Sequence, residues 1–417
     1  MNRGKKPMSD AQPLAVLHVI SGLSIGGAEM MLLKLLQTTE PGAARAGVLS
    51  LSEGGVLADD IRAQGLPLWH IAMPGGFPSP GFSRRFRAVV EEFKPDVVMA
   101  WMYRANAVCS QLVPRRIPVI WNVRQSLDHN SSQRLLFRFT RRVNLWISGR
   151  PRMVIYNSRA SHQQHLEFGF RAAEQRVIPN GFDLDRFQPQ PEARARLRGE
   201  WGVAEGDLVF GIVGRFHPIK DHLGFIRAAG LAVLQEPEGG ARMVFVMVGR
   251  GLDRDNDKLM AEIRAAGIEE RVHLLGEQRD LPGLYSAFDV QVSASLVEAF
   301  PNVLGEAMAC GLPCVATAVG DSAWVVGDTG RVVEPERPQQ LAQAMVELAK
   351  LAPEERRALG AAARTRVQQE FGIASVAQRF LEAQREATGR QAGKPPSRRG
   401  DKLAGPGTNP SDFPGPS

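Results

Sequence analysis

The chain of 417 residues carries a formal net charge of +7, and 44% of its residues are hydrophobic. This length allows two or more domains with sizeable cores, and the composition is typical of a soluble α/β protein. No apolar run reaches the roughly 20 residues of a membrane-spanning helix, and three cysteines exclude an even disulfide framework, so we expect a reducing, cytoplasmic environment.

The positive charge is concentrated in the first part of the chain. Residues 1–180 contain 23 Lys and Arg residues against 12 Asp and Glu residues, whereas the remainder has an acidic excess. This asymmetry suggests an anionic partner surface for the basic part only.

The chain begins with a predicted disordered tail, residues 1–13, which has no apolar core of the signal-peptide type. A strand over 14–20, a glycine loop and a helix over 28–37 follow, as at the start of a doubly wound unit. Gly26 and Gly27 would let the backbone approach an anion at the helix start. A plain tight turn explains the same glycines, so both interpretations stay open.

Helical patterns separate the strands that follow, and together they predict one Rossmann-like domain over residues 14–182. Polar residues with prolines at 186–193 then indicate an interdomain linker. Further strands of the first domain are expected at 46–51, 68–71, 97–101, 119–121 and 153–156.

A basic amphipathic helix is expected at 134–147. Most of its arginines lie off a stripe of residues at helical spacing, Leu135, Phe139, Val143 and Trp146. The pattern fits an anionic membrane surface, and it fits equally a helix that packs on the core with a solvated basic side. Nucleic acid is disfavoured, because no nucleic-acid module is recognisable.

A second Rossmann-like domain is predicted over 183–372. Asp221 is placed to cap its first helix. From 389 to 417 the chain has almost no apolar residues, so a disordered tail is expected there. The strands of the second domain are expected at 208–213, 243–248, 272–275, 290–292, 314–316 and 331–333, and its later helices at 341–348, 353–368 and 373–386.

Two carboxylates separated by seven residues stand out in the segment 293–317. The alternating run 288–292 before them predicts a half-buried strand, and Pro301 is expected at the first position of a helix. Glu298 then lies in the connecting loop, and Glu306 lies about one turn into the helix.

The start of this helix is a candidate phosphate site. The free amides of Phe300, Asn302 and Val303 would face an anion, most simply a phosphate. The two carboxylates would be repelled by the same phosphate, so we expect them to accept hydrogen bonds from neighbouring hydroxyls. Phosphate donors and hydroxyl acceptors side by side describe a nucleotide sugar.

Arg215 and Lys220 lie five residues apart in the loop after the first strand of the second domain. Two cations at this end of a strand are placed for a diphosphate, and in a transfer reaction they would stabilise the charge on a leaving diphosphate. Considered alone, they are explained equally well as solvated loop residues.

Four other residues are weaker candidates for metal binding or catalysis, and structural roles explain them better. Asp253, Asp255 and Asp257 alternate as metal-binding acids can, but the glycine and glutamate of a calcium loop are missing, which favours helix capping and a solvated face. His18, inside the first strand, is interpreted as a core residue. No metal site is predicted.

Five short motifs follow one another along the chain, and they make it similar to one known family. They are Gly26-Gly27-Ala28-Glu29, Ile178–Asp183, Gly214-Arg215 with Lys220, Val248–Gly251, and Glu298-x7-Glu306 with the following Ala-Met-Ala-Cys-Gly-Leu-Pro. Over nearly its whole length the chain resembles the family 4 retaining glycosyltransferases of the GT-B fold, the glycosyl transferases group 1. The set in this order is very specific, whereas any one motif alone is not.

The resemblance implies two Rossmann-like domains that face each other across a cleft, with the donor between them. It implies that the last helix, within 373–388, crosses back to the first domain. It also implies that Glu306 holds the donor ribose and that Glu298 lies against the sugar or its hydroxyls.

The same resemblance implies that Arg215 and Lys220 hold the diphosphate, helped by the Gly26-Gly27 loop, and that Gly249 belongs to the substrate-binding set. No cofactor or bound metal is then required, because protein cations do that work. Retention is usually drawn as front-side displacement, in which the leaving phosphate accepts the acceptor's proton.

The chain departs from the family pattern at two places. Many relatives have a His where this chain has Trp121-Asn122-Val123-Arg124, so Arg124 or His129 is expected to take part instead. Many relatives have Gly where Pro301 stands, which removes one amide from the phosphate cradle.

The resulting hypothesis is a cytoplasmic glycosyltransferase, peripheral at the inner face of the plasma membrane. It would move a sugar from a nucleoside diphosphate donor, UDP first, to a lipid-linked saccharide or similar acceptor in cell-envelope, lipopolysaccharide or exopolysaccharide assembly. Two alternatives stay open: a sugar-nucleotide epimerase of the same fold, and a catalytically silent nucleotide-binding scaffold protein.

Overall fold

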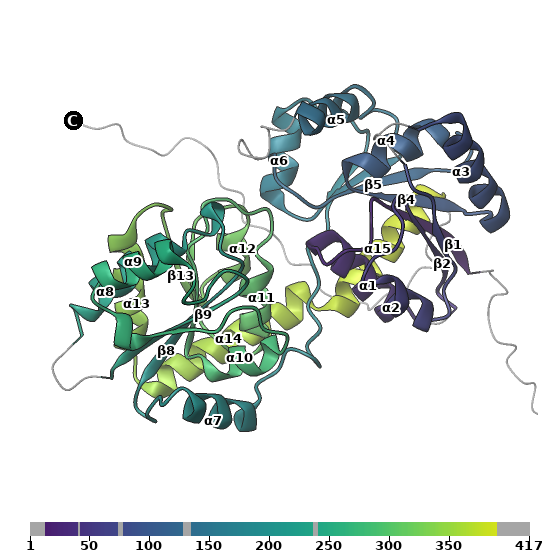
Figure 1. Ribbon diagram of the computed structural model, residues 1–417. Helices are drawn as coiled ribbons and strands as arrows, with labels where there is room; N and C mark the ends of the chain where they lie inside the picture. Colours follow the sequence, from purple (N-terminus) through teal and green to yellow (C-terminus); the bar gives the residue numbers. More distant parts are fainter. Residues whose placement is uncertain (1–12, 41, 74–77, 128–134, 237–240, 390–417) are drawn as a thin grey trace, which may run out of the picture.

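Two α/β domains lie side by side in the computed structural model (Figure 1). It describes residues 13–40, 42–73, 78–127, 135–236 and 241–389, so most of both predicted tails and His129 lie outside the described residues. Each domain is built on one parallel sheet, which confirms the predicted fold class of two Rossmann-like units.

The first domain has a seven-stranded parallel sheet in the order β3-β2-β1-β4-β5-β6-β7. Its strands are β1 (Leu14–Ile20), β2 (Ala44–Ser50), β3 (Leu68–His70), β4 (Val97–Trp101), β5 (Val119–Val123), β6 (Met153–Tyr156) and β7 (Gln175–Val177). Its helices are α1 (Gly27–Thr38), α2 (Ala58–Ala63), α3 (Pro80–Phe93), α4 (Met102–Leu112), α5 (Leu135–Trp146) and α6 (Arg159–Glu167).

The second domain has a six-stranded parallel sheet in the order β10-β9-β8-β11-β12-β13. Its strands are β8 (Leu208–Val213), β9 (Met243–Val248), β10 (Val272–Leu274), β11 (Val290–Ser293), β12 (Cys314–Thr317) and β13 (Gly330–Val333). The remaining helices are α7 (Pro191–Glu200), α8 (His222–Val233), α9 (Asp257–Ala265), α10 (Leu281–Ala287), α11 (Asn302–Ala309), α12 (Ser322–Val326), α13 (Pro338–Ala349), α14 (Pro353–Phe371) and α15 (Ile373–Ala387).

The central strands are buried on both faces, because helices cover each sheet from two sides, whereas the edge strands β3, β7, β10 and β13 are largely of intermediate exposure. All seven residues of β1 are buried, and two separate apolar clusters lie on the two faces of each sheet. The prediction of a half-buried strand before Glu298 is therefore wrong. Every residue of β11 is buried, including the polar Gln291, as is usual in a parallel sheet.

Three local expectations need correction. Helix α7 begins at Pro191, inside the segment interpreted as a linker, because proline is well suited to the first position of a helix. Pro301 caps α11 rather than occupying its first turn, and the helix begins at Asn302. The short strand β7 was not predicted, since three residues give no measurable periodicity.

The order of each sheet defines where loops can form a site. Strand order reverses between β1 and β4 in the first domain and between β8 and β11 in the second. In open α/β sheets, ligands bind at the carboxyl ends of the strands beside such a reversal. The loops after β8 and β11 are the ones that carry Lys220 and Glu298.

Two chain segments pass between the domains next to each other. The Phe182 amide donates to the Phe371 carbonyl at 2.9 Å, and the Ile373 amide donates back to the Phe182 carbonyl at 2.9 Å. Helix α14 packs on α11 in the second domain, and α15 packs on α1 in the first (Figure 1). These paired segments, 182 and 371–373, form the hinge of the molecule.

Helix α15 completes the core of the first domain. Phe380 is 2% exposed, and its ring stacks on that of Trp101 with centroids 6.3 Å apart. Val376 and Ala383 are buried in the same apolar cluster, which also contains residues of β1 and β4.

We expect Phe380→Ala to destabilise the first domain by about 3–5 kcal/mol, because the substitution leaves a cavity beside Trp101. Thermal unfolding followed by calorimetry should show a lowered transition. Leu234→Ala is the matched control, since Leu234 is 83% exposed and its loss should change stability by less than about 0.5 kcal/mol. Equal effects of the two substitutions would contradict the packing described for α15.

Candidate functional site

The loops after β8 and β11 lie at the boundary between the two domains. The Ser126 hydroxyl, from the loop after β5, donates to the backbone carbonyl of Glu298 at 2.9 Å. The side-chain amide of Asn180, at the end of the first domain, donates to Asn302 Oδ1 at 2.6 Å. Both contacts join the first domain to the segment that holds the paired glutamates.

Lys220 and Glu298 form an ion pair across the two loops. The Ser295 hydroxyl also donates to Glu298 Oε1, at 2.8 Å. The side chains of Lys220 and Glu298 are 24% and 14% exposed, so each is largely shielded from water but still reachable from the domain boundary. An ion pair in this position has a stronger electrostatic effect on a bound ligand than a fully solvated pair.

The residue after Lys220 fixes the direction of this loop. Asp221 adopts a left-handed conformation with φ of 46°, and its carboxylate accepts a hydrogen bond from the Gly224 amide at 3.0 Å. The predicted cap is therefore present, and it sets the turn that directs Lys220 toward β11. Arg215, in the same loop, is exposed, and no ion pair involves it within the part of the chain that the structure describes.

Two helix N-termini approach each other at the boundary. A Cβ on Gly27, the first residue of α1, would lie 3.9 Å from Asn302 Nδ2, at the start of α11. Helix α11 has no side-chain cap, and the amides of Phe300, Asn302 and Val303 have no acceptor among the described residues. Two partly positive helix ends with available amides make a favourable environment for an anion.

Glu306 lies on α11, where it faces both a tyrosine and the first domain. The Tyr285 hydroxyl donates to Glu306 Oε2 at 3.1 Å. Burial raises the pKa of Glu306, and the charge of Lys34 on α1, the Tyr285 hydrogen bond and the charge of Arg186 act in the opposite direction. A carboxylate held in this way is a strong hydrogen-bond acceptor for a hydroxyl.

Arg124 is a buried cation below the domain boundary. Its guanidinium donates to Asn122 Oδ1 at 3.0 Å and to Asn180 Oδ1, and its carbon lies 5.7 Å from the centre of the Phe380 ring. Burial lowers the pKa of Arg124 to about 9. Because Asn180 in turn contacts Asn302, Arg124 supports the start of α11.

Gly249 has a backbone role in the second domain. Its φ of 149° and the close approach of the Gly214 backbone leave no room for a Cβ. Its amide donates to the Gly276 carbonyl at 2.7 Å, so that donor is already used. Gly249 brings the loops after β8 and β9 together, and through them it acts on the position of Arg215.

The weaker candidates have structural roles. His18 is buried, accepts a hydrogen bond from the Trp101 indole at 3.2 Å, and has its pKa lowered by burial to about 3. Asn256, rather than one of the neighbouring aspartates, caps α9 by accepting from the Leu259 amide at 3.2 Å. Within the described ranges, no group of three or more His, Cys, Asp and Glu residues has the arrangement of a metal site.

Three residues near the boundary were not identified from the sequence. Lys34 interrupts the apolar helix α1, which is a signal that could have been noticed, and its ammonium donates to the Gly181 carbonyl at 3.3 Å. Tyr285 has no distinguishing pattern. Asp321 contacts only backbone amides of the first domain, and no sequence motif encodes such a contact.

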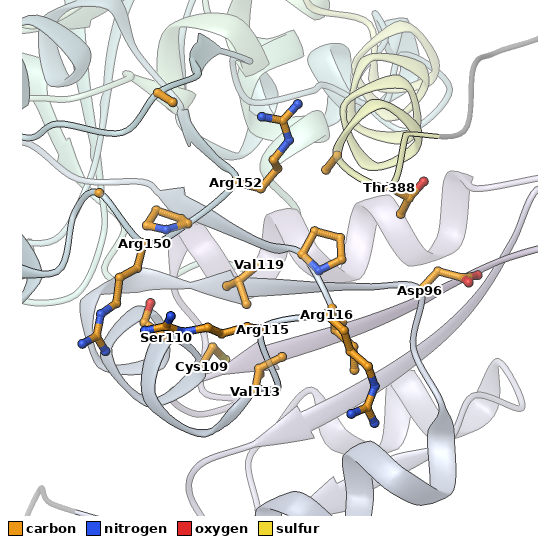
Figure 2. A pocket seen from close by; sticks show the side chains of 16 residues that line it. Asp96, Cys109, Ser110, Val113, Arg115, Arg116, Val119, Arg150, Arg152 and Thr388 are labelled. Carbon is orange, nitrogen blue, oxygen red and sulfur yellow. The ribbon is translucent and has the colours of Figure 1, made fainter.

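A separate cavity of about 800 Å³ lies in the first domain, at the amino ends of its strands (Figure 2). It is lined by residues that precede β4, β5 and β6, so it is remote from the carboxyl ends of the strands. Four exposed arginines border it, Arg115, Arg116, Arg150 and Arg152. The arginines give this cavity a positively charged rim that suits an anion, and none of the predicted donor-binding residues lines it.

The exposed residues of α5 bear on its role. Trp146 is 82% exposed and Phe139 is 50% exposed, whereas Asn144 is buried and donates to the Tyr103 carbonyl at 3.0 Å. The predicted apolar stripe therefore does not face the core at these two aromatics. No helix in the described part of the chain combines the length and hydropathy needed to cross a bilayer.

Two family models match the chain, and together they cover more than half of it. Residues 25–186 match Glycosyltransferase Family 4, and residues 207–350 match Glycosyl transferases group 1. The first match covers most of the first domain and ends just past residue 182, and the second contains Arg215, Lys220, Glu298 and Glu306.

Curated relatives agree with these matches. EpsF of Bacillus subtilis (strain 168), named as a glycosyltransferase, is 28% identical over 331 residues, which cover 76% of this chain and 81% of EpsF. The D-inositol 3-phosphate glycosyltransferase of Kribbella flavida is 32% identical over 250 residues, which cover 58% of each chain.

Solved structures share the fold. Anabaena Alr3699/HepE in complex with UDP superposes with a TM-score of 0.76 at 25% identity, over 89% of this chain and 99% of HepE. WaaG, a glycosyltransferase involved in lipopolysaccharide biosynthesis, has a TM-score of 0.63 at 18% identity, over 89% of this chain and 99% of WaaG.

We expect pyrophosphate to bind at the domain boundary and Arg215→Ala to weaken that binding roughly tenfold or more, because a charge-assisted hydrogen bond is lost. Isothermal titration calorimetry measures the dissociation constant. Arg264→Ala is the matched control, since Arg264 is an exposed arginine on α9. If Arg215→Ala bound pyrophosphate as well as the control did, Arg215 would not belong to the site.

Proposed function

Because this chain belongs to the family 4, group 1 glycosyltransferases, we propose that it transfers a sugar from a nucleoside diphosphate donor, UDP first, to a lipid-linked saccharide or similar acceptor in cell-envelope or exopolysaccharide assembly. One observation carries the proposal. The Lys220–Glu298 pair lies at the boundary where the N-termini of α1 and α11 converge. Cations and free amides are thus placed for a diphosphate, next to carboxylates placed for hydroxyls.

UDP is the nucleotide that we propose first. HepE, whose sheets superpose on those of this chain, has been solved with UDP and with UDP-glucose. In the proposed site, Glu306 accepts hydrogen bonds from the hydroxyls of the ribose. The raised pKa of Glu306 does not prevent this role, because Lys34 and Tyr285 favour its charged form.

In the proposed reaction, the bond between the anomeric carbon and the β-phosphate oxygen breaks while the acceptor hydroxyl bonds to that carbon. The pair of electrons passes to the diphosphate, and the leaving phosphate accepts the acceptor's proton. Lys220, Arg215 and the amides at the start of α11 stabilise the diphosphate as its charge increases. We propose that these protein groups provide this stabilisation without a bound metal ion.

The two alternatives predict different products. A sugar-nucleotide epimerase would convert the donor with no acceptor present, and a silent scaffold would bind UDP without turnover. The Lys220–Glu298 pair favours the transferase over the scaffold, because a protein that only binds nucleotide has no need of a shielded ion pair against the sugar. Family membership favours transfer over epimerisation.

The acceptor side of the proposal includes a membrane surface. The exposed aromatics of α5 and the four arginines around the cavity in Figure 2 both belong to the first domain. Trp146 ends α5, and Gly149 and Arg150 of the following loop line that cavity. An exposed tryptophan next to arginines suits the interface of an anionic bilayer, so we propose peripheral binding at the inner face of the plasma membrane.

We expect Glu306→Ala to lower donor turnover by at least about tenfold, because the buried ribose hydroxyls would lose a charged acceptor. The assay combines a thermal-shift screen of UDP-, GDP- and ADP-sugars with mass spectrometry of products formed on lipid-linked acceptors, in buffer with a chelator. Glu262→Ala on α9 is the control for removing a partly buried glutamate elsewhere. Unchanged turnover in a folded Glu306→Ala variant would refute the assignment of Glu306.

We expect the double variant Arg150→Ala/Arg152→Ala to bind anionic vesicles roughly tenfold or more weakly, since each arginine near such a surface contributes about 1 kcal/mol. Sedimentation with vesicles containing phosphatidylglycerol, compared with phosphatidylcholine alone, measures this binding. Arg264→Ala/Arg357→Ala removes the same charge from exposed positions of the second domain. Equal losses in the two double variants would mean that net charge, and not this face, determines binding.

A further inference from the structure

Asp321 connects the two domains through its side chain. Its Oδ2 accepts a hydrogen bond from the Arg159 amide at 2.7 Å, and its Oδ1 accepts one from the Ala160 amide at 3.0 Å. These are the first two amides of α6, in the first domain, whereas Asp321 precedes α12 in the second. Asp321 is only 4% exposed, so the contact is almost completely shielded from water.

This contact is unusual for a residue at the start of a helix. Asp321 occupies the N-cap position of α12, yet its carboxylate makes no capping bond within its own helix. Helix α6 has its own cap in Ser158, which accepts only from the Ser161 amide, at 2.9 Å. The first-turn amides of α6 are therefore fully satisfied only when the other domain supplies a carboxylate.

A second contact reinforces the first. The Arg159 guanidinium lies over the Trp324 ring, 4.0 Å from its centre. A cation above the face of a tryptophan is favourable, and its energy rises as water is excluded. Arg159 and Trp324 belong to the same two helices as the Asp321 contact, so both interactions form or break together.

The Asp321 segment also holds the backbone beside Glu298. The Asp321 amide donates to the Ala299 carbonyl at 3.1 Å. Gly320, with φ of 54°, packs so closely on the Glu298 carbonyl that a Cβ has no room. The Ser126 hydroxyl donates to this same carbonyl from the first domain.

These contacts form a closed ring across the boundary. On the first-domain side, the Ser161 hydroxyl donates to the Gln125 carbonyl at 2.7 Å, which joins α6 to the loop that carries Ser126. The two interdomain links of this ring, at Asp321 and at Ser126, are thus joined by hydrogen bonds within each domain. Movement of α6 away from Asp321 would therefore release the loop of Glu298 as well.

Burying the Asp321 carboxylate costs desolvation energy, which suggests that the contact selects one arrangement of the domains and adds little to net stability. Burial raises the pKa of Asp321, and the two amides and the charge of Arg159 act in the opposite direction. A buried carboxylate that has to be desolvated is poor evidence of net stabilisation, but it selects one geometry over others. The contact therefore defines one relative position of the two domains.

We propose that Asp321 is a positioning residue for sugar transfer: its carboxylate binds the start of α6 and thereby holds the loop of Glu298 against the first domain. The expected effect on kinetics rests on the proposed function, whereas the expected effect on the position of the loop does not. The donor diphosphate would be bound chiefly by Lys220, Arg215 and the start of α11, and the Asp321 carboxylate is bonded to the Arg159 and Ala160 amides instead of to these groups. Loss of Asp321 should thus affect the chemical step far more than donor binding.

The test compares Asp321→Ala with the wild-type enzyme by hydrogen exchange and by kinetics. We expect faster amide exchange in the segments 158–165 and 296–299. We also expect kcat to fall by roughly tenfold or more, with the donor KM changed less than about threefold. Asp328→Asn, an exposed aspartate two residues after α12, is the matched control and should change neither quantity.

Two further variants test the proposal if Asp321→Ala does not fold or has indirect effects. Asp321→Asn keeps one acceptor oxygen and should give an intermediate loss of kcat, so it replaces Asp321→Ala if the latter fails to fold. In a double-mutant cycle with Ser126→Ala, the two losses should be clearly less than additive, because both residues hold the same loop.

Three results would overturn the proposal. They are unchanged exchange in both segments, unchanged kcat in a variant whose α6 amides exchange faster, and strictly additive effects with Ser126→Ala. If the wild-type enzyme turns over no sugar nucleotide, the proposed function fails, and the exchange measurement still decides whether Asp321 holds the loop.

Discussion

The structure depends on bringing a cation and a carboxylate together where two parallel sheets present their loops to each other. Lys220 and Glu298 come from loops 78 residues apart, and they meet because β8 and β11 are neighbours at the reversal of strand order. A pair shielded in this way has to be held by its surroundings, since neither charge is fully hydrated. Asp221 and Ser295 provide that support from the same two loops.

The first domain contributes to the same arrangement from the other side. Arg124, Asn180 and Asn302 form a chain of hydrogen bonds that extends from the floor of the first domain to the start of α11. Among the described residues no carboxylate pairs with this buried guanidinium, and burial lowers its pKa. Its surroundings, two asparagines and two aromatic rings, orient it without neutralising it, so its positive charge acts on the domain boundary.

Much of the fold could be predicted from the sequence, because buried parallel strands are continuous apolar runs bounded by glycine and polar loops. The bounds of β1, β4, β6, β8 and β9 were predicted correctly for this reason. Alternation gave the wrong burial for β11, since Gln291 is polar and yet lies inside the sheet. The predicted starts of two helices differ from the observed ones. Helix α7 begins at Pro191, inside the predicted linker, and Pro301 lies one residue before α11, because proline fits both the first position of a helix and the position before it.

The site could be predicted only as far as residue types reveal it. The glutamate pair and the two cations were proposed from their spacing, but the Lys220–Glu298 contact was not predicted, because spacing along one chain does not show which loops meet. The contact of Asp321 could not be predicted, because its partners are backbone amides, and every residue except proline has one. The role of Arg124 as a support for α11, through Asn180, likewise follows from coordinates alone.

The hinge at residues 182 and 371–373 has a consequence for the synthesis of the protein. Because Phe380 and its neighbours on α15 complete the apolar cluster of the first domain, that domain is discontinuous in the chain. Domains usually fold in the order in which they leave the ribosome. Here the continuous second domain can finish first, while the domain that emerges earlier has to wait until α15 has been translated.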